Sequence, residues 1–372
     1  MDLQTSLANR ARYLASFCEH AKYLNFASLG PSSAQVIEIG ESLSRAASTG
    51  QSEAGLLLAG QEARAIAYLS NLSGFSAQNI VLVSNTSSAL VQIAIGLPIG
   101  TSIIAGGYQF PANVWPWRNA GAMGRLKTKF IGGLDEPVTP ELIRSNLCNE
   151  TDCVAISAVD FRTGYVTSLS EMREAIGDRL LIVDAIQGFG VVDQDWSLAD
   201  VVISGGQKWM RAGQGTGFMA LSDRALDCIS PIAGNWAGIE NSLNVRLSNQ
   251  PPLPGAARFE ATRFSPVLAG CFAEALKLID SVSVTWIGAE ISKRQEFLQH
   301  KAAEFGLEFL SCKDSKTQAG IAVIRAPSTA AISRIHDAGY TLTFHDDLRI
   351  RVSMHATTQF DALSDLLSTL AE

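Results

Sequence analysis

The stretch VVISGGQKWMRAGQGTGFMALS, residues 201–222, places one lysine between two apolar runs inside a glycine-rich segment. The runs 201–206 and 215–222 have the length and the apolar content of buried strands. A lysine that needed only solvation would not require this setting. The pattern therefore predicts that Lys208 is held at a defined place just after a strand.

Upstream of Lys208 the chain repeats one theme, a short apolar strand followed by a turn and a helical segment. Helical stretches at 87–96 and 170–176 lie between predicted strands. This alternation predicts an α/β fold with a mostly parallel sheet sandwiched by helices, whose ligands lie beyond the carboxyl ends of the strands. The further strands we predict are 79–85, 102–107, 126–132, 153–160 and 180–185.

The pattern of alternating strands and helices ends near residue 250, where SNQPPLPGAARF is rich enough in Pro and Gly to be a connector between domains. Helical periodicity and four short strand-like segments follow, which is the order expected of a smaller α+β domain at the C-terminus. We predict an N-terminal segment, 1–30, that packs with this small domain, a large domain at 31–260 and the small domain at 261–372.

The composition excludes several classes of protein. The net charge of −7 argues against a nucleic-acid partner. No apolar run approaches the roughly 18 residues of a membrane span, and no secretory signal pattern is present, so we expect a cytoplasmic protein. Six cysteines without CxxC spacing or a His cluster indicate neither a metal site nor a disulfide framework, and we interpret them as buried thiols.

Polar side chains fall at or just after the predicted strand ends. Asp184 ends one strand, Asp160 ends another, Thr86 and Ser87 follow a third, and Lys208 follows a fourth. A lysine and an acid on neighbouring strand ends, beside a turn that suits phosphate, are typical of pyridoxal phosphate enzymes. There the lysine forms a Schiff base, and the acid keeps the pyridine nitrogen protonated.

Each residue also has a plainer interpretation. Thr86, Ser87 and Ser88 open a helix, whose N-H groups and dipole suit a phosphate, yet a Ser or Thr at that place can simply cap the helix. Asp184 could cap a turn between a strand and a helix, and Lys208 could be an exposed loop lysine. The combination is what favours a cofactor site.

Residues 180–209 resemble the segment of fold-type I, class V aminotransferases in which an Asp, a Gln three residues later and a Lys about two dozen residues on hold pyridoxal phosphate. The resemblance covers nearly the whole chain and implies an aspartate aminotransferase-like large domain and a homodimer. Four further stretches agree in order and spacing: YLNFASLGPSS (23–33), VSNTSSAL (83–90), GYQFPANVWPW (107–117) and IRVSMH (350–355).

The resemblance implies a role for each matching residue. Lys208 would form the Schiff base and move the proton at the substrate α-carbon, while Asp184 would pair with the ring nitrogen. Gln187 would donate to the ring hydroxyl oxygen. Phe110 would stack on the ring, unless it only packs in the core.

The remaining matches concern the phosphate and the substrate. Thr86 and Ser87 would hold the phosphate. Arg351 would bind the substrate α-carboxylate with its planar fork, although a surface arginine on a strand is the simpler alternative.

The chain also departs from the family pattern. Where many relatives have Ser-x-His-Lys, this chain has Gln207 before the lysine, and Gln207 would replace one of the missing phosphate contacts. RFEAT at 258–262 lacks the glycine of the family pattern, so Thr262 or instead Trp236 would reach the phosphate of a neighbouring subunit. Either contact requires a homodimer.

The reaction is less determined than the cofactor. The sequence is most similar to the branch with the ergothioneine-pathway hercynylcysteine sulfoxide C-S lyase and isopenicillin N epimerase-like proteins. This implies β-elimination from an S-substituted cysteine or its sulfoxide, which with hercynylcysteine sulfoxide would give ergothioneine, pyruvate and ammonia. Aromatic candidates for binding the cationic tail of such a substrate are Phe26, Tyr108, Trp115 and Trp236.

The alternatives are a class V aminotransferase or epimerase acting on another amino acid, a cysteine desulfurase, and a non-catalytic binding module. No cysteine lies between Asp314 and Arg351, where a desulfurase would carry its nucleophile, and this disfavours that activity.

Overall fold

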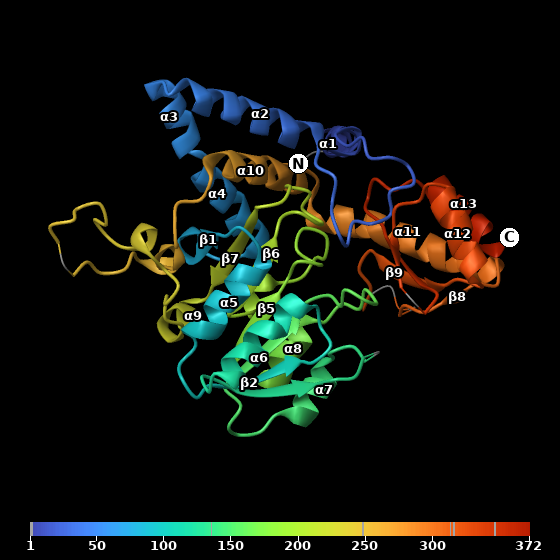
Figure 1. Ribbon diagram of the computed structural model, residues 1–372. Coiled ribbons are helices and arrows are strands. Elements are labelled where there is room, and N and C mark those ends of the chain that lie inside the picture. Colours follow the sequence, from blue (N-terminus) through green and yellow to red (C-terminus); the bar gives the residue numbers. More distant parts are fainter. Residues whose placement is uncertain (1–2, 135, 248, 313, 315–316, 346) are drawn as a thin grey trace.

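The computed structural model describes residues 3–134, 136–247, 249–312, 314, 317–345 and 347–372. The larger of its two sheets has the strand order β1-β7-β6-β5-β4-β2-β3 (Figure 1). Its strands are β1 (Ile80–Leu82), β2 (Ser102–Gly106), β3 (Lys127–Ile131), β4 (Cys153–Ser157), β5 (Leu180–Asp184), β6 (Val201–Gly205) and β7 (Gly217–Leu221).

This sheet is mostly parallel. Strands β2 to β6 pair in parallel, whereas β7 runs antiparallel to both β6 and β1, so β1 shares the common direction. The carboxyl ends of β1, β4, β5 and β6 consequently lie along one edge. Most of the predicted strands are a residue or more longer than the observed ones. The prediction of a mostly parallel sheet sandwiched by helices is confirmed.

The sheet is buried on both faces, which explains why its strands read as continuous apolar runs. Successive residues of β5 enter different cores: Leu181 and Val183 lie in one, and Ile182 lies in the other. The first core is covered by α4 (Gln61–Ser73), α7 (Pro140–Asn146), α8 (Leu169–Ile176) and α10 (Pro266–Val282), and the second by α5 (Thr86–Gly96), α6 (Trp115–Ala122) and α9 (Asp223–Cys228).

The C-terminal part forms the predicted smaller α+β domain, with a separate apolar core. Its sheet is antiparallel in the order β10-β11-β9-β8. Its elements are α11 (Val284–Glu304), β8 (Glu308–Phe309), β9 (Ile321–Arg325), α12 (Thr329–Asp337), β10 (Thr343–Phe344), β11 (Arg349–Ser353) and α13 (Phe360–Ala371). Strand β11 lies in the middle of this sheet and carries Arg351.

The N-terminal region contains α1 (Leu3–Ala15), α2 (Ala34–Thr49) and α3 (Ser52–Ala59). Between α1 and α2, Tyr23 forms a β-bridge to Thr341 and Asn25 forms one to Ser353. Helix α10 packs on α2 and α4. The division of the chain at residues 30 and 260 stays a prediction.

The interpretation of all six cysteines as buried thiols is wrong. Cys153 is buried, but Cys18, Cys148 and Cys228 are exposed, because each lies in a loop or at a helix end rather than in a strand. The described residues contain no cluster of His, Cys, Asp or Glu suited to a metal ion. A search of those residues also finds no helix that could serve as a membrane span.

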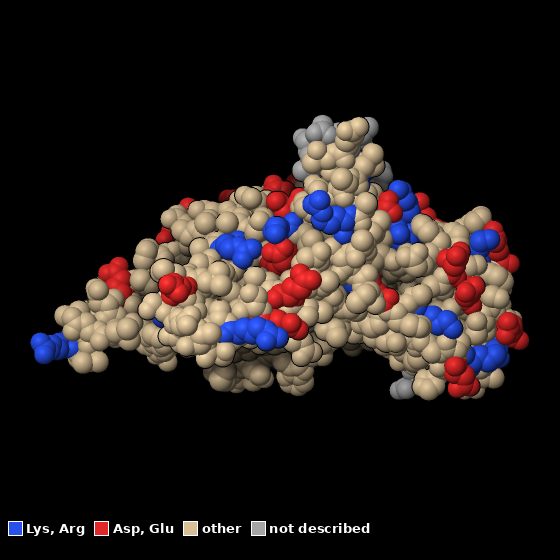
Figure 2. Space-filling model, turned by 90° about the horizontal axis from the view of Figure 1, so that it is seen from above, with Lys and Arg blue, Asp and Glu red and all other residues tan. Residues whose placement is uncertain are grey.

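The charge of the surface is mixed on the face seen from above, where acidic and basic side chains are interspersed (Figure 2). Both views show a long arm, formed by residues 239–247 and 249–252, that extends away from the body of the molecule (Figures 1 and 2). The two ends of the arm meet at an isolated β-bridge between Ile239 and Pro252.

Candidate active site

Lys208 and Asp184 lie beyond the carboxyl ends of two adjacent strands. Asp184 is the last residue of β5, and Lys208 follows the last residue of β6 by three positions. Both side chains are buried, with 2% of Asp184 and 9% of Lys208 exposed. Lys208 is thus not an exposed loop lysine, and its amine faces the carboxylate closely enough for each charge to shift the pKa of the other.

Burial controls the ionisation of Lys208. Loss of hydration lowers the pKa of its amine to about 8; the charge of Asp184 opposes this shift, and the charge of Arg351 adds to it. The amine nitrogen lies 5.3 Å from the centroid of the Phe110 ring. An amine with this pKa is partly neutral near pH 7, as a nucleophile or a proton acceptor must be.

Asp184 does not cap a helix, because turns rather than a helix follow β5. Burial raises the pKa of its carboxyl group to about 6, against the hydrogen bond from the Ile186 N-H at 3.1 Å and the charge of Lys208. A buried carboxylate of this kind gains from a cation beside it, and a protonated pyridine nitrogen supplies one.

Gln187 is buried, and its amide is held at both ends. Its Nε2 donates to the carbonyl oxygen of Ala27 at 3.0 Å, and its Oε1 accepts from the indole N-H of Trp209 at 2.7 Å. The predicted contact to a ring oxygen therefore depends on the second hydrogen of the amide nitrogen.

The start of α5 offers a place for phosphate. Asn85 caps this helix by accepting from the Ser88 N-H at 2.8 Å, so neither Thr86 nor Ser87 is the cap. The Thr86 hydroxyl is buried and has no hydrogen-bond partner among the described residues, while Ser87 is exposed. A buried hydroxyl beside free helix N-H groups fits an anionic ligand.

This helix start lies close to Lys208. The Val83 N-H donates to the carbonyl oxygen of Gly217, which pairs with Gly205 at the end of β6. A side chain at Gly217 would not fit, since its Cβ would lie 2.8 Å from the Ser204 carbonyl oxygen. Gln207, the residue before Lys208 in the chain, is half-buried.

Phe110 is not a core residue, because 42% of it is exposed. Its ring meets Phe161 edge to face at 5.3 Å. Phe161 belongs to the loop after β4, and so does Asp160, which was predicted as a strand end. Asp160 pairs with Arg162 at 2.6 Å and does not contact Lys208 by any hydrogen bond or ion pair of the described residues.

Arg351 is buried, so it is not a surface arginine. Its Nη1 donates to the Phe161 carbonyl oxygen at 3.0 Å, and its Nη2 donates to the hydroxyls of Ser28 and Thr343 at 2.9 and 3.1 Å. Its Nε has no partner, and no carboxylate among the described residues forms an ion pair with it. A buried guanidinium without a carboxylate partner is a site for an anion.

Ala27, Ser28 and Gly30 were missed as part of the site, although they lie inside the quoted stretch 23–33. Ser28 binds Arg351, the Ala27 carbonyl binds Gln187, and the Gly30 N-H donates to the Gln207 carbonyl oxygen at 2.8 Å. The one sequence signal for this role was that these residues lie within a stretch that resembles a family motif. A serine and a glycine such as Ser28 and Gly30 do not by themselves indicate a binding site.

Trp236 and Thr262 lie at the base of the arm and are not brought to the other site residues. Trp236 is 37% exposed, and the centroid of its ring lies 5.7 Å from the guanidinium carbon of Arg263. Thr262 is exposed. Among the described residues, neither has a hydrogen bond or ring contact with Lys208 or Asp184. Within one protomer they do not complete the site.

The four aromatic candidates for a substrate cation divide into two groups. Phe26 is completely buried and packs against Tyr23 and His355, so it does not line the mouth of the site. Tyr108 and Trp115 are 51% and 58% exposed on either side of Phe110 in the sequence.

The chain resembles several solved structures over nearly its whole length. The apo cysteine desulfurase from Thermococcus onnurineus has a TM-score of 0.83 and 18% identity, with 93% of this chain and 92% of that chain covered. The cystine C-S lyase C-DES, in complex with its product cysteine persulfide, has a TM-score of 0.81 and 20% identity, with 94% and 97% covered.

The cysteine desulfurase CsdA from Escherichia coli has a TM-score of 0.79 and 16% identity, with 96% of each chain covered. These identities establish the fold. No curated protein sequence matches the chain. The model of the family described as aminotransferase class-V matches residues 45–341, which include β1 to β9 and the segment with Asp184 and Lys208. The protein belongs to the class V aminotransferase family, whose cofactor is pyridoxal 5'-phosphate.

Proposed function

We propose that the protein is a β-eliminating C-S lyase that acts on an S-substituted cysteine or a cysteine sulfoxide. The observation that supports this most is the grouping of Lys208, Asp184 and Arg351, in which Arg351 is buried and forms no ion pair with a carboxylate of the described residues. Such an arrangement suits an amino acid substrate, since it offers a base, a counter-ion for the cofactor and a cation for the α-carboxylate.

Each side chain has one task in this proposal. Arg351 binds the α-carboxylate with the part of its guanidinium that has no protein partner. Lys208 removes the proton from the substrate α-carbon, and Asp184 holds a proton on the ring nitrogen. The cofactor, when bound, supplies a ring that withdraws electrons from the α-carbon. Departure of the sulfur group from the β-carbon then leads to pyruvate and ammonia.

The other predicted residues would hold the cofactor. Thr86 and Ser87, with Gln207, would contact the phosphate, and the unpartnered Thr86 hydroxyl supports this. Phe110 would lie against the ring, because its own ring already faces the Lys208 amine at 5.3 Å. Gln187 would donate its second amide hydrogen to the ring oxygen.

A lyase is favoured over a cysteine desulfurase by the positions of the thiols. Burial keeps the Cys153 thiol protonated by raising its pKa, and Cys148 lies before the amino end of β4, at the edge opposite Lys208. Cys312 makes a contact of 3.2 Å with the Thr317 hydroxyl just after β8. Among the described residues, none of these three thiols has a hydrogen bond or ion pair with Lys208 or Asp184, which supports a lyase.

We propose hercynylcysteine sulfoxide as the substrate, whose elimination would release a sulfenate from the β-carbon. A two-electron reduction of this sulfenate by a thiol would then give ergothioneine as the sulfur-containing product. The exposed rings of Tyr108 and Trp115 beside Phe110 support a substrate whose tail carries a quaternary ammonium group, because a cation binds over an aromatic face.

Product analysis tests the reaction. The purified protein, supplied with pyridoxal phosphate and an S-substituted cysteine or its sulfoxide, should release pyruvate and ammonia in equal amounts over many turnovers without a keto-acid acceptor. An aminotransferase would stop after one half-reaction, and a desulfurase would release alanine. Either of those outcomes would reject the lyase.

The rate of cofactor capture should depend on pH. Only the neutral amine of Lys208 attacks the aldehyde, so the rate constant for binding by the apoprotein should rise about tenfold per pH unit below pH 8 and level off above it. Stopped-flow absorbance would measure this. Because the charge of Asp184 raises the pKa of Lys208, Asp184→Asn should move the midpoint to lower pH.

We further propose that the protein is a homodimer in which Trp236 and Thr262 reach the phosphate of the partner subunit. Large apolar side chains are exposed on both the arm and α3, as expected of a surface that a second copy covers. They are Leu243 at 77% and Val245 at 92% on the arm, and Leu56 at 79% and Leu57 at 48% on α3.

Mixing inactive variants tests the shared site. Chains with Lys208→Ala and chains with Trp236→Ala, dissociated and reassociated together at limiting cofactor, should recover roughly a quarter of wild-type activity, because half of the dimers regain one intact site. Mixing Lys208→Ala with Arg351→Met is the matched control and should recover none, since both residues act in one protomer. Equal recovery in the two mixtures would contradict the shared site.

A further inference from the structure

Arg211 has an unusual backbone conformation for an arginine. It follows Lys208 by three residues and has a φ of 59°, in the left-handed region that favours glycine. Only 2% of it is exposed. A buried arginine in an unfavourable conformation must be held there by its side chain, so the contacts of the guanidinium are informative.

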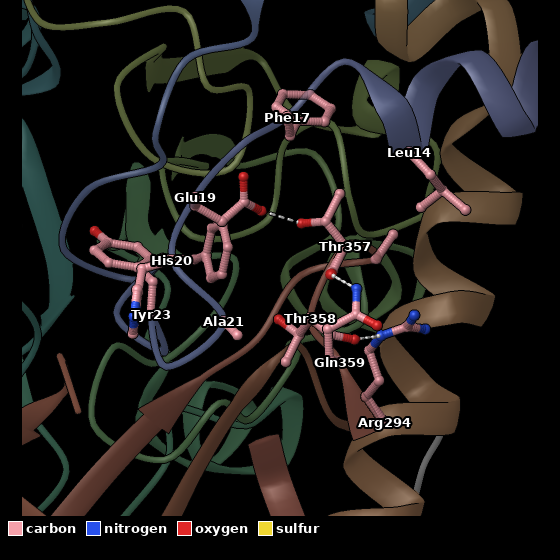
Figure 3. Close-up of a pocket in the computed structure, with 12 residues that line it drawn as sticks. Leu14, Phe17, Glu19, His20, Ala21, Tyr23, Arg294, Thr357, Thr358 and Gln359 are labelled. Atoms are coloured by element: carbon pink, nitrogen blue, oxygen red, sulfur yellow. Dashed lines mark hydrogen bonds between the residues drawn. The ribbon is translucent and has the colours of Figure 1, made fainter. Parts of the chain in front are cut away.

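The guanidinium of Arg211 binds two distant parts of the chain. Its Nε donates to the Pro31 carbonyl oxygen at 2.6 Å, its Nη2 pairs with Glu19 at 2.6 Å, and its Nη1 donates to the Thr357 hydroxyl at 3.1 Å. Thr357 in turn donates to Glu19 (Figure 3). We call Arg211, Glu19 and Thr357 the clasp.

The clasp is a desolvated ion pair. Burial alone would raise the pKa of the Glu19 carboxyl group, but the adjacent Arg211 charge and its hydrogen bonds lower it, so the carboxylate is ionised. The Phe17 ring lies 3.5 Å from the Arg211 guanidinium carbon and covers it. The charge of Arg211 is therefore matched by one carboxylate.

The clasp holds the backbone of Lys208 against the segment 25–31. Gly30 lies so close that a Cβ there would be 1.9 Å from the Lys208 carbonyl oxygen, and its N-H binds the carbonyl oxygen of Gln207. Pro31, the next residue, is the one that Arg211 binds. Lys208 is thus fixed between Gly30 on one side and the anchored Arg211 on the other.

On the side of the clasp that faces away from Lys208, a cavity takes the place of packed apolar side chains. The cavity, of about 260 Å³, borders the clasp and is lined by residues of the N-terminal segment, by Arg294 and by residues 356–359 (Figure 3). Glu19 and Thr357 belong to this lining. With open space on that side, the polar contacts of the clasp determine how firmly the segment is seated.

We propose that Arg211 is a positioning residue, which acts through the clasp with Glu19 and Thr357 to hold the Lys208 amine at the reacting atoms. This inference rests on the proposed role of Lys208. Arg211 itself touches neither the substrate nor the cofactor in this role. It follows that loosening the clasp changes the placement of the amine and leaves the substrate carboxylate site at Arg351 in place.

Two variants of the holoenzyme test the clasp. Arg211→Gly keeps a residue that accepts the backbone conformation, and Glu19→Gln keeps the size of the side chain but removes its charge. Both should lower kcat by about 10- to 100-fold with KM changed less than about twofold, because a small displacement of a reacting group is costly. Both should also lose bound cofactor about tenfold faster and shift the pH midpoint of its visible absorbance.

Glu290→Gln is the matched control, because it removes an ion pair to the buried Arg294 at 2.8 Å without touching the Lys208 segment. It should leave kcat, the absorbance midpoint and cofactor release unchanged. If Arg211→Gly fails to fold, Glu19→Gln decides the question alone.

Wild-type kcat, absorbance and cofactor release in Glu19→Gln would overturn the positioning role. Equal losses in Glu290→Gln would also overturn it, because they would show a general effect of stability. A wild-type protein that binds no cofactor at Lys208 would instead reject the proposed function, so the two failures are distinguishable.

Discussion

Protein with Lys208→Ala should bind no coloured cofactor after purification with pyridoxal phosphate, and its turnover should fall by at least about 1,000-fold. The amine is proposed both to attach the cofactor and to move the α-proton, and loss of a general base alone costs about 100- to 10,000-fold. Visible absorbance and pyruvate release would measure the two effects. Among the described residues, Lys208 is the lysine that is buried beside Asp184, so no other lysine of this part of the chain is placed to substitute for it.

Lys293→Ala is the control for this experiment, because Lys293 is 62% exposed and pairs with Glu290 on the surface of α11. It should leave both the colour and the activity unchanged. A coloured and active Lys208→Ala protein would show that another group carries the chemistry, and the assignment of the site would be abandoned.

The same lysine should lower the stability of the apoprotein. Its pKa falls from 10.5 to about 8 on folding, so the unfolded chain binds the proton more tightly. The free energy that folding spends on burying the charged amine is zero above pH 10.5, where the amine is neutral in both states. This cost grows as the pH falls and reaches its full value below about pH 8. Lys208→Met should therefore stabilise the apoprotein at pH 7 by about 1 to 3 kcal/mol in urea unfolding, and the gain should vanish near pH 10.5.

Protein with Arg351→Met should keep its cofactor colour and lose most of its activity. The guanidinium is proposed to bind the α-carboxylate, and the loss of charge-assisted hydrogen bonds costs about 3 kcal/mol, or roughly 100-fold in kcat/KM. Steady-state kinetics would measure this. The colour should persist because Arg351 is bound to Phe161, Ser28 and Thr343 rather than to Lys208.

The matched control is Arg325→Met on the neighbouring strand β9. Arg325 pairs with Glu308 at 2.6 Å and is 44% exposed, so it already has a carboxylate partner and solvent. Its removal should leave kcat/KM near the wild-type value. Comparable losses in the two variants would indicate that the sheet as a whole, and not the carboxylate site, was damaged.

Much of the large domain could be predicted from the sequence, because strands buried on both faces appear as continuous apolar runs. Once these strands are parallel, their carboxyl ends share one edge, and Lys208 and Asp184 must be neighbours. The burial of cysteines was less predictable. Cys18, Cys148 and Cys153 have the same side chain, but of these three only Cys153 lies within a strand, and only Cys153 is buried.

Contacts between distant segments could not be predicted. Ser28 and Arg351 are 323 positions apart, and the Glu19–Arg211 pair spans 192 positions. Nothing in the local sequence shows that Phe26 is buried while Trp115 is exposed, because both belong to similar mixtures of apolar and small residues. The burial of Phe26 depends on how the N-terminal segment crosses the small domain, whereas Trp115 lies at the start of α6 with its ring exposed.

The order of apolar runs and helical stretches was thus sufficient to predict an α/β sheet with a lysine and an acid at one edge, because strands joined by crossover helices run parallel. Only the folded chain showed that, among the residues the structure describes, Arg351 has no carboxylate partner and the Thr86 hydroxyl has no hydrogen-bond partner, and that Arg211 pairs with Glu19. Those properties arise where segments far apart in the chain exclude water together, and such a meeting has no local pattern in the sequence.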